Sequence, residues 1–217
     1  QSDAAGKTGN RNSGSLDMEK LSQQEIESLL AESPLTLPEE VFDAAPSTAA
    51  PYTTGKVKTS ALQAAADRLN ALRRIAGLPA VTLDLSLCEN AQYGAVIQAA
   101  NGSLDHYPDQ PAGMGDSFYQ QAKSASASSN LAAGHTLTGA VDAFMDDSDA
   151  SNIATLGHRR WQLNPTLGKV GFGYAVSGQG YSRYVAEMVH DRSGDGCDYD
   201  FIGWPASGSF PAQLFDG

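Results

Sequence analysis

The sequence predicts an α+β fold in which helices come first and an antiparallel pair of strands follows. Two observations indicate this class. Apolar residues recur at helical spacing through the earlier part of the chain, and two runs rich in Val and Tyr follow at 169–176 and 181–189. Because strands joined by a short connection pair antiparallel, this order is typical of α+β proteins rather than of alternating α/β proteins.

Length and composition exclude several protein classes. The chain has 217 residues, enough for one domain with additional segments, and its 41% hydrophobic content excludes fully disordered and collagen-like proteins. No run approaches the ~18 consecutive apolar residues of a membrane-spanning helix, so we expect no transmembrane segment in this chain. With 14 basic and 25 acidic residues the net charge is −11, which disfavours nucleic acid as a partner.

We expect the segment 1–57 to lie outside the main domain, as a polar lead, a short helix and a linker. The helix is predicted within 16–32 from an apolar stripe formed by Leu16, Leu21, Ile26, Leu29 and Leu30. We expect this stripe to pack against the domain, since it would otherwise face water. Four prolines in 33–57 exclude regular structure there, so this part is either a linker or an arm lying over the domain.

Three helices are predicted in the segment 58–190, which we expect to form the main domain. Each has one apolar side at helical spacing. The expected bounds are Thr59 or Ser60 as N-cap to Ile75, near Asp84 to Gly102, and about Thr138 to Asp147. Because each helix has a single apolar side, all three should pack against something flat.

The two predicted strands supply that flat element. Glycines at 178 and 180 suit a hairpin connection between them. In the first strand Gly171 and Gly173 alternate with larger residues, and they leave one face of the strand without side chains. This pattern predicts that a helix packs closely against that face.

Chemistry in this chain is expected to rest on two of its four histidines, because the nucleotide-binding and common hydrolase signatures are absent. His106 follows a helix stop, and His158 stands between the third helix and the first strand. With a carboxylate they would form an open site for a divalent metal or an acid–base cluster. Helix geometry turns Asp147 inward, which makes it the candidate carboxylate. The alternatives are two structural histidines and an acidic helix end in water.

Two further features leave alternatives open. Cys88 and Cys197 either form one long-range disulfide or are separate buried thiols. The first positions of a calcium loop are matched by Asp191, Ser193 and Asp195. Ile202 stands where such a loop needs a bidentate glutamate, so a solvated turn is the alternative to calcium binding.

Several segments, taken in order, resemble the CAP superfamily. The resemblance extends from about Ser60 to Val189 and is carried by RLNALRRIAGLPAVTLDLSLCENAQYGA, LDHYP, SSNLAAGHTLTGAVDAFMDD and GHRRWQLNPTLGKVGFGYAV. This superfamily includes the SCP, cysteine-rich secretory, antigen-5 and pathogenesis-related-1 type domains. The chain is most similar to the cysteine-poor bacterial branch.

The resemblance implies a three-layer α-β-α sandwich with a central antiparallel sheet flanked by helices, in an extracellular, secreted or cell-surface protein. It places His106, His158 and Asp147 in a central cleft that holds a divalent metal such as zinc in some members. Ser129 stands where many members have an acidic residue, which disfavours a mechanism needing paired carboxylates. The segment 191–217 is expected to be a strap over the domain, similar to extensions that lead into further modules.

Three functions follow as expectations. The leading one is a binding module whose cleft takes a divalent metal or a small amphiphile, with a protein, cell-wall or lipid partner. The second is a metal-assisted hydrolase, in which His106 and His158 hold the metal that activates water and Asp147 is the base. The third is a structural spacer at the cell surface whose cleft is vestigial.

Overall fold

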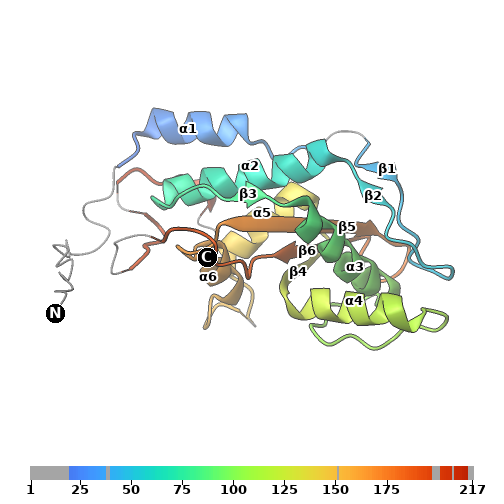
Figure 1. The fold of residues 1–217 in the computed structure, drawn as a ribbon. Coiled ribbons are helices and arrows are strands. Elements are labelled where there is room, and N and C mark those ends of the chain that lie inside the picture. The colour runs from blue at the N-terminus through green and yellow to red at the C-terminus, as the bar shows by residue number, and fades with distance from the viewer. Residues whose placement is uncertain (1–19, 38–39, 151, 197–200, 207, 215–217) are drawn as a thin grey trace, which may run out of the picture.

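The computed structural model describes residues 20–37, 40–150, 152–196, 201–206 and 208–214 (Figure 1). Its helices are α1 (Gln23–Glu32), α2 (Thr59–Ile75), α3 (Leu85–Asn101), α4 (Asp116–Ala127), α5 (Leu137–Asp146) and α6 (Gly157–Gln162), with a 3₁₀ helix at Ala212–Leu214. Its strands are β1 (Phe42–Ala44), β2 (Lys56–Val57), β3 (Thr82–Leu83), β4 (Ser129–Ala133), β5 (Lys169–Val176) and β6 (Arg183–Met188). The α+β class is confirmed.

The central sheet has the strand order β3-β5-β6-β4. Strand β6 pairs antiparallel with both β4 and β5, but β3 pairs parallel with β5, so the sheet is mixed rather than wholly antiparallel as predicted. The chain from β3 to β5 passes through several helices, and a long crossover of this kind permits parallel pairing. Two residues, Thr82 and Leu83, are too few to show a strand period in the sequence.

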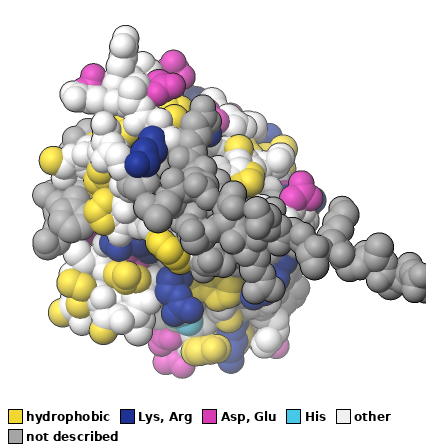
Figure 2. Space-filling model, turned by 90° about the vertical axis from the view of Figure 1, so that its left-hand side faces the viewer, with side chains coloured by type: hydrophobic (Ala, Val, Ile, Leu, Met, Phe, Trp, Pro, Cys, Tyr) yellow, Lys and Arg dark blue, Asp and Glu magenta, His cyan; other side chains and the backbone are white. Residues whose placement is uncertain are grey.

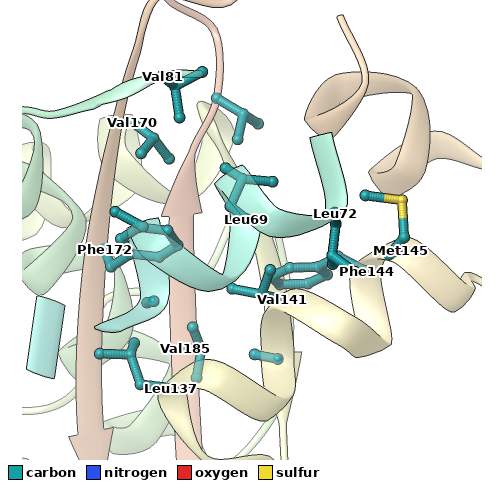
Figure 3. Close-up of a cluster of buried hydrophobic side chains, with 14 of the residues drawn as sticks. Leu69, Leu72, Val81, Leu137, Val141, Phe144, Met145, Val170, Phe172 and Val185 are labelled. Atoms are coloured by element: carbon teal, nitrogen blue, oxygen red, sulfur yellow. The ribbon is translucent and has the colours of Figure 1, made fainter. Parts of the chain in front are cut away.

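Helices cover both faces of this sheet, which confirms the three layers (Figure 1). On one side α2 and α5 pack against Phe172 and Val185, and these side chains point toward one another with those of Leu69, Val141 and their neighbours (Figure 3). On the other side α3 packs against the small residues of β5 and β6, with α4 behind it. The alternation of side chains along β5 therefore divides the interior into two cores.

The glycines of β5 bring helix α3 unusually close to the sheet. A Cβ atom at Gly173 would lie 2.3 Å from the carbonyl oxygen of Ala91, and one at Gly171 would lie 2.4 Å from the backbone of Leu87. Neither position can hold a side chain while the helix stays in place. The prediction that a helix presses against this bare strand face is confirmed.

The N-terminal elements pack on the domain. Helix α1 begins after Ser22, which forms a capping box with Glu25, and Ile26 is buried against α2 and its surroundings. The predicted docking of this apolar stripe is confirmed for the described residues; positions 16–19 lie outside them. The segment 40–57 is an arm rather than a free linker, because Phe42 stacks on Tyr174 with ring centroids 5.7 Å apart.

An ion pair joins helices α2 and α5, which cover one face of the sheet. The guanidinium of Arg68 on α2 donates to both carboxylate oxygens of Asp142 on α5, at 2.7 and 2.6 Å. It also donates to the carbonyl of Ser33 at the end of α1. Because Arg68 is only 4% exposed, this bidentate pair is held in a largely dehydrated setting.

Near the C-terminus, the described residues lie against the same core. Ala206 and Leu214 are buried in it, and the ring of Trp204 meets that of Phe210 edge-on at 4.9 Å. No helix among the described residues is long and apolar enough to cross a membrane. On the face shown in Figure 2, lysine and arginine side chains are scattered among hydrophobic, acidic and polar ones, so the described residues there form no continuous basic surface.

Candidate functional site

A cavity of about 540 Å³ opens beside strand β4. We call it the histidine cavity, because three of its lining residues are histidines. The lining consists of Leu104, Asp105, His106, Leu131, Ala132, Ala133, His135, Ala143, Phe144, Asp149, Asn152, His158 and Tyr181. The structure thus brings His106 and His158, which are far apart in the chain, to one cavity.

His106 is held by helix α4. Its Nδ1 lies 2.9 Å from the carbonyl oxygen of Ser126, near the end of that helix. A carbonyl oxygen can only accept, so Nδ1 carries the hydrogen and donates it. In the neutral ring Nε2 is then the acceptor, and within the described residues no hydrogen bond engages it.

His158 is held in the same tautomer by Asp147. Its Nδ1 donates to Oδ1 of Asp147 at 2.9 Å, so that Nε2 is again the acceptor atom. The other carboxylate oxygen accepts from the backbone N–H groups of His158, at 3.0 Å, and Arg159, at 3.2 Å. One carboxylate therefore fixes both the imidazole ring and the first turn of helix α6.

Two strained residues make this arrangement possible. Asp147, directly after helix α5, has φ 49°, and Leu156, directly before helix α6, also has φ 49°. A positive φ is costly for a residue with a Cβ and is often found at functional sites. Together they turn the chain so that the start of α6 meets the end of α5.

Asp147 is engaged by helix α6 in this structure. Its side chain is fully buried, both of its oxygens accept hydrogen bonds from α6, and it is not among the residues that line the histidine cavity. In this arrangement its carboxylate positions His158. Its roles as a third metal ligand or as a base stay predictions.

Metal binding stays a prediction. Among the described residues no three His, Cys, Asp or Glu side chains are placed to hold a metal ion, so the described donors do not make a three-ligand zinc site. Of the candidate calcium loop, Asp191, Ser193 and Asp195 are described, and residues 197–200 lie outside the described residues. Oδ2 of Asp191 accepts from the backbone N–H of Lys169 at 2.9 Å and from the hydroxyl of Ser193 at 2.6 Å, which joins this segment to β5.

Two other predictions concern Ser129 and Cys88. Ser129, at the position where the family resemblance led us to expect an acidic residue, is buried on β4 and donates its hydroxyl hydrogen to the carbonyl of Ala125, so it belongs to the contact with α4. Within the described residues Cys88 is a buried free thiol; Cys197, with which a disulfide was one of the two alternatives, lies outside them, so neither alternative is decided. Burial raises the pKa of Cys88 to about 11, which makes its thiol unreactive near neutral pH.

Several residues of the site were not selected from the sequence. His135 lines the cavity and lies within the segment SSNLAAGHTLTGAVDAFMDD, but it was not chosen as a candidate, and Tyr181 lines the cavity without belonging to any quoted motif. Glu187 on β6 was missed as well. Its carboxyl group is completely buried and accepts from Asn130 at 2.9 Å and from Gln162 of helix α6 at 3.0 Å, and an acidic residue inside a Val- and Tyr-rich strand would ordinarily be assigned to the solvent face.

The fixed charges in the described lining of the cavity are negative. Among the described residues that line it, Asp105 and Asp149 are acidic and none is lysine or arginine. Leu104 and Tyr181 at its edge are 42% and 58% exposed. The cavity therefore offers imidazole nitrogens, carboxylates and apolar surface, but no cationic side chain except a protonated histidine.

Comparison with known proteins supports the family resemblance. The profile of the CAP family, described as the cysteine-rich secretory protein family, matches residues 66–188. No curated protein matched the chain significantly. Among solved structures, the chain is similar to an extracellular protein containing an SCP domain from Bacillus anthracis strain Ames, with 20% sequence identity and a TM-score of 0.41. That alignment covers 62% of this chain and 41% of the other, so the chain spans about two fifths of that protein's length.

Proposed function

The chain belongs to the cysteine-rich secretory protein (CAP) family, and from this premise we propose that it is a secreted or cell-surface binding module whose histidine cavity holds a small ligand. One observation carries the proposal. His106 and His158 line the same cavity, and each has its Nδ1 bonded to a protein acceptor, which leaves Nε2 as an acceptor for a ligand. Rings fixed in advance lose little freedom on binding, which favours affinity.

The charges of the lining narrow the class of ligand. Two aspartates and no lysine or arginine line the described part of the cavity, so a carboxylate or phosphate group would find no cationic partner at neutral pH. Two Nε2 acceptors favour a ligand with hydrogen-bond donors, such as hydroxyl or ammonium groups. Leu104, Phe144 and Tyr181 offer apolar contact. We therefore propose a neutral or cationic amphiphile.

Three probes of equal chain length test this ligand class. Octyl glucoside, octylammonium and octanoate, each below its micelle concentration, are titrated into the isotopically labelled protein while the imidazole signals are followed. We expect the first two to shift the signals of His106 and His158 and octanoate to shift neither. Binding of octanoate as strong as that of octylammonium would contradict the proposed ligand class.

Variants locate the binding. His106→Gln and His158→Gln should weaken octyl glucoside binding, because each removes an Nε2 acceptor from the cavity. His190→Gln is the matched control, since His190 stacks on Trp161 and is not among the lining residues. Equal affinity in all four proteins would show that the ligand binds elsewhere, and the proposal would then be wrong.

A second candidate function is hydrolysis, and the Asp147–His158 contact is the observation that favours it. A buried carboxylate that orients an imidazole is the arrangement of a general base. No Ser, Thr or Cys is among the described lining residues, so His158 would have to activate water rather than a side chain. Cleavage of peptide or ester substrates that disappears in His158→Gln would support this function. If no peptide or ester substrate in a broad panel is cleaved, the binding module remains the proposed function.

Metal binding is a separate proposal that comes from the family resemblance. Calorimetric titration with zinc tests it on the parent chain and on the double variant His106→Ala, His158→Ala. Heat that disappears in the double variant would show that the two imidazoles bind zinc without help from Asp147. Equal heats from both proteins would exclude binding through these rings.

A further inference from the structure

The side chain of Gln162 lacks one hydrogen bond. Gln162 is the last residue of helix α6 and is completely buried. Its Nε2 donates to the two carboxylate oxygens of Glu187, at 3.0 and 3.1 Å, and to the carbonyl of Val141 at 3.2 Å, while its Oε1 has no partner among the residues that the structure describes. A buried acceptor without a donor costs about 1–3 kcal/mol, so a donor is expected beside it.

A proton on Glu187 is the donor that the cluster needs. A protonated carboxyl group and an amide can form two reciprocal hydrogen bonds, O–H to Oε1 and Nε2–H to the second carboxyl oxygen. Both oxygens of Glu187 lie within 3.1 Å of Nε2, so a rotation of the Gln162 amide that gives up the longer bond to Val141 would form this pair. The reciprocal pair satisfies Oε1, which an ionised carboxylate cannot do.

The surroundings of Glu187 also favour the neutral acid. Its neighbours in the sheet are Asn130 on β4 and Phe172 on β5, neither of which is charged. Burial raises the pKa of Glu187 to about 7, and the hydrogen bonds from Gln162 and Asn130 offset this only in part. At neutral pH a small change in this environment is enough to add or remove the proton.

Charged groups on the packed helices are engaged with other partners. On α6, His158 bonds to Asp147, and the guanidinium of Arg159 donates to the carbonyls of Met145 and Asp146. Arg73 of α2 donates to the backbone carbonyls of Gln162 and Asn164, at the C-terminal end of α6. The hydrogen bonds to Glu187 therefore come from two neutral amides.

The cluster is joined directly to the histidine cavity. Helix α6 has six residues, with His158 at its second position and Gln162 at its last. Asn130, which donates to Glu187, also lies 3.4 Å from the carbonyl oxygen of His158. A change that loosens Gln162 or Asn130 will therefore move His158.

We propose that Glu187 is a positioning residue whose proton controls ligand affinity at the histidine cavity. With the proton present, the cluster of Asn130, Glu187 and Gln162 holds helix α6 against the sheet. Loss of the proton leaves a buried charge and an unpaired Oε1, which loosens α6 and displaces His158. Ligand affinity should then fall as the pH rises through neutrality. This inference rests on the proposed binding function for its effect on affinity, but not for the movement of the helix.

The first experiment needs no ligand. The side-chain carboxyl ¹³C signal of Glu187, assigned by its loss in Glu187→Gln, is followed by NMR from about pH 5 to 9 together with the ring signals of His158 and Trp161. We expect a step near neutral pH in the Glu187 signal, accompanied by a step at the same pH in the ring signal of Trp161, the residue before Gln162 on α6. Glu89→Gln, the same change on an exposed residue of α3, is the control and should keep the step.

The Glu187→Gln variant distinguishes the titration step of Glu187 from the titration of nearby histidines. His190, which stacks on Trp161, has its pKa lowered by partial burial and by the nearby charges of Arg192 and His106, so its own step falls at lower pH and should persist in Glu187→Gln. A Glu187 signal that titrates near its ordinary value of 4.5, or a neutral step unchanged in Glu187→Gln, would overturn the proposal. If Glu187→Gln does not fold, a Trp161 signal without a step at the midpoint of Glu187 in the parent chain overturns it equally.

The second experiment measures affinity. Binding of octyl glucoside, which is uncharged at every pH used, should weaken by about tenfold between pH ~6.5 and ~8.5 if bound ligand raises the pKa of Glu187 by about one unit. Glu187→Gln should abolish this loss. If the parent and Glu187→Gln lose affinity equally, the proposal that Glu187 controls affinity is wrong. If nothing binds at any pH, the proposed function fails while the ligand-free titration still decides the role of Glu187.

Discussion

Asp147 and His158 lie 11 positions apart in the chain, and the Asp147 carboxylate accepts hydrogen bonds from both the ring Nδ1 and the backbone N–H of His158. The same carboxylate thus sets the tautomer of a cavity-lining imidazole and caps the helix that carries it. Removing its charge should affect both properties together.

Asp147→Asn should destabilise the protein by about 2 kcal/mol, because the amide NH₂ group would face N–H donors at the start of α6. It should also release part of the His158 population into the other tautomer. Denaturant unfolding and long-range ¹H–¹⁵N spectra of the imidazoles measure the two effects. Asp146→Asn, one residue earlier and only half-buried, is the control. Full stability with an unchanged tautomer would contradict this role of Asp147.

Gly173→Ala should be among the most damaging single substitutions, since its Cβ would meet the carbonyl oxygen of Ala91 at 2.3 Å. We expect a loss of about 3 kcal/mol or more in the free energy of unfolding, because the whole helix α3 would have to shift. Gly178→Ala is the matched control in the hairpin, where an added Cβ has no atom within 4 Å. Similar losses in the two variants would show that α3 does not press on β5 as described.

Asp142→Ala should cost about 3–5 kcal/mol, because it leaves the buried guanidinium of Arg68 without its carboxylate partner. The exposed pair of Lys56 and Asp43, with side chains 70% and 47% exposed, provides the comparison. Asp43→Ala should cost less than about 1 kcal/mol. Urea unfolding of both variants under the same conditions tests the contrast, and equal losses would refute it.

Glu187 should make stability depend on pH. At a pH below its ordinary pKa of 4.5 the group is protonated in both the folded and the unfolded chain and has no effect. Between 4.5 and about 7 the unfolded chain loses the proton first, so the free energy of unfolding falls as the pH rises. The total loss is on the order of 3 kcal/mol.

Comparison with Glu187→Gln isolates this effect from other titrating groups. The difference in unfolding free energy between this variant and the parent should shift in favour of the variant by on the order of 3 kcal/mol between pH ~4 and ~8.5. Unfolding in urea at several pH values measures it, with Glu89→Gln as the reference. A constant difference across that range would show that Glu187 has the same pKa in both states.

Cys88 should resist alkylation in the folded protein, since burial keeps its thiol protonated. Iodoacetamide labelling followed by peptide mapping measures this, and Ser60→Cys supplies an exposed thiol on α2 for reference. We expect labelling of Cys88 only after unfolding. Labelling that also requires a reducing agent would reveal a disulfide with Cys197, and rapid labelling of the native protein would contradict the burial.

The pattern of apolar residues was enough to predict α2, α3, α5 and the β5–β6 hairpin, although α3 and both strands are packed on two sides in the structure. It did not predict α4, a segment without Leu, Ile or Val whose contact with α3 is made by small residues such as Ala122 and Ala125. Strand β4 was missed because SNLAA has low strand propensity and is extended by its pairing with β6.

The candidate site, like the fold, could be predicted from the sequence only in part. The sequence analysis selected His106, His158 and Asp147; the structure places both histidines at one cavity and Asp147 against His158, while their function stays a prediction. The role of Asp147 could not be predicted, because it depends on the left-handed backbone at Asp147 and Leu156, which no motif records. Glu187 and Gln162 are 25 positions apart, and only the folded chain shows that they are hydrogen-bonded and that Oε1 of Gln162 has no partner among the described residues.

The contacts of the N-terminal arm also bear on how this protein should be handled. Sequence likeness to the family begins at residue 66, yet Phe42 covers the ring of Tyr174 and Tyr52 donates its hydroxyl hydrogen to the carbonyl of Ala112. A gene fragment trimmed to the matched region would expose the aromatic side chains beneath and invite aggregation. Expression boundaries for such proteins are better chosen from tertiary packing than from the edges of an alignment.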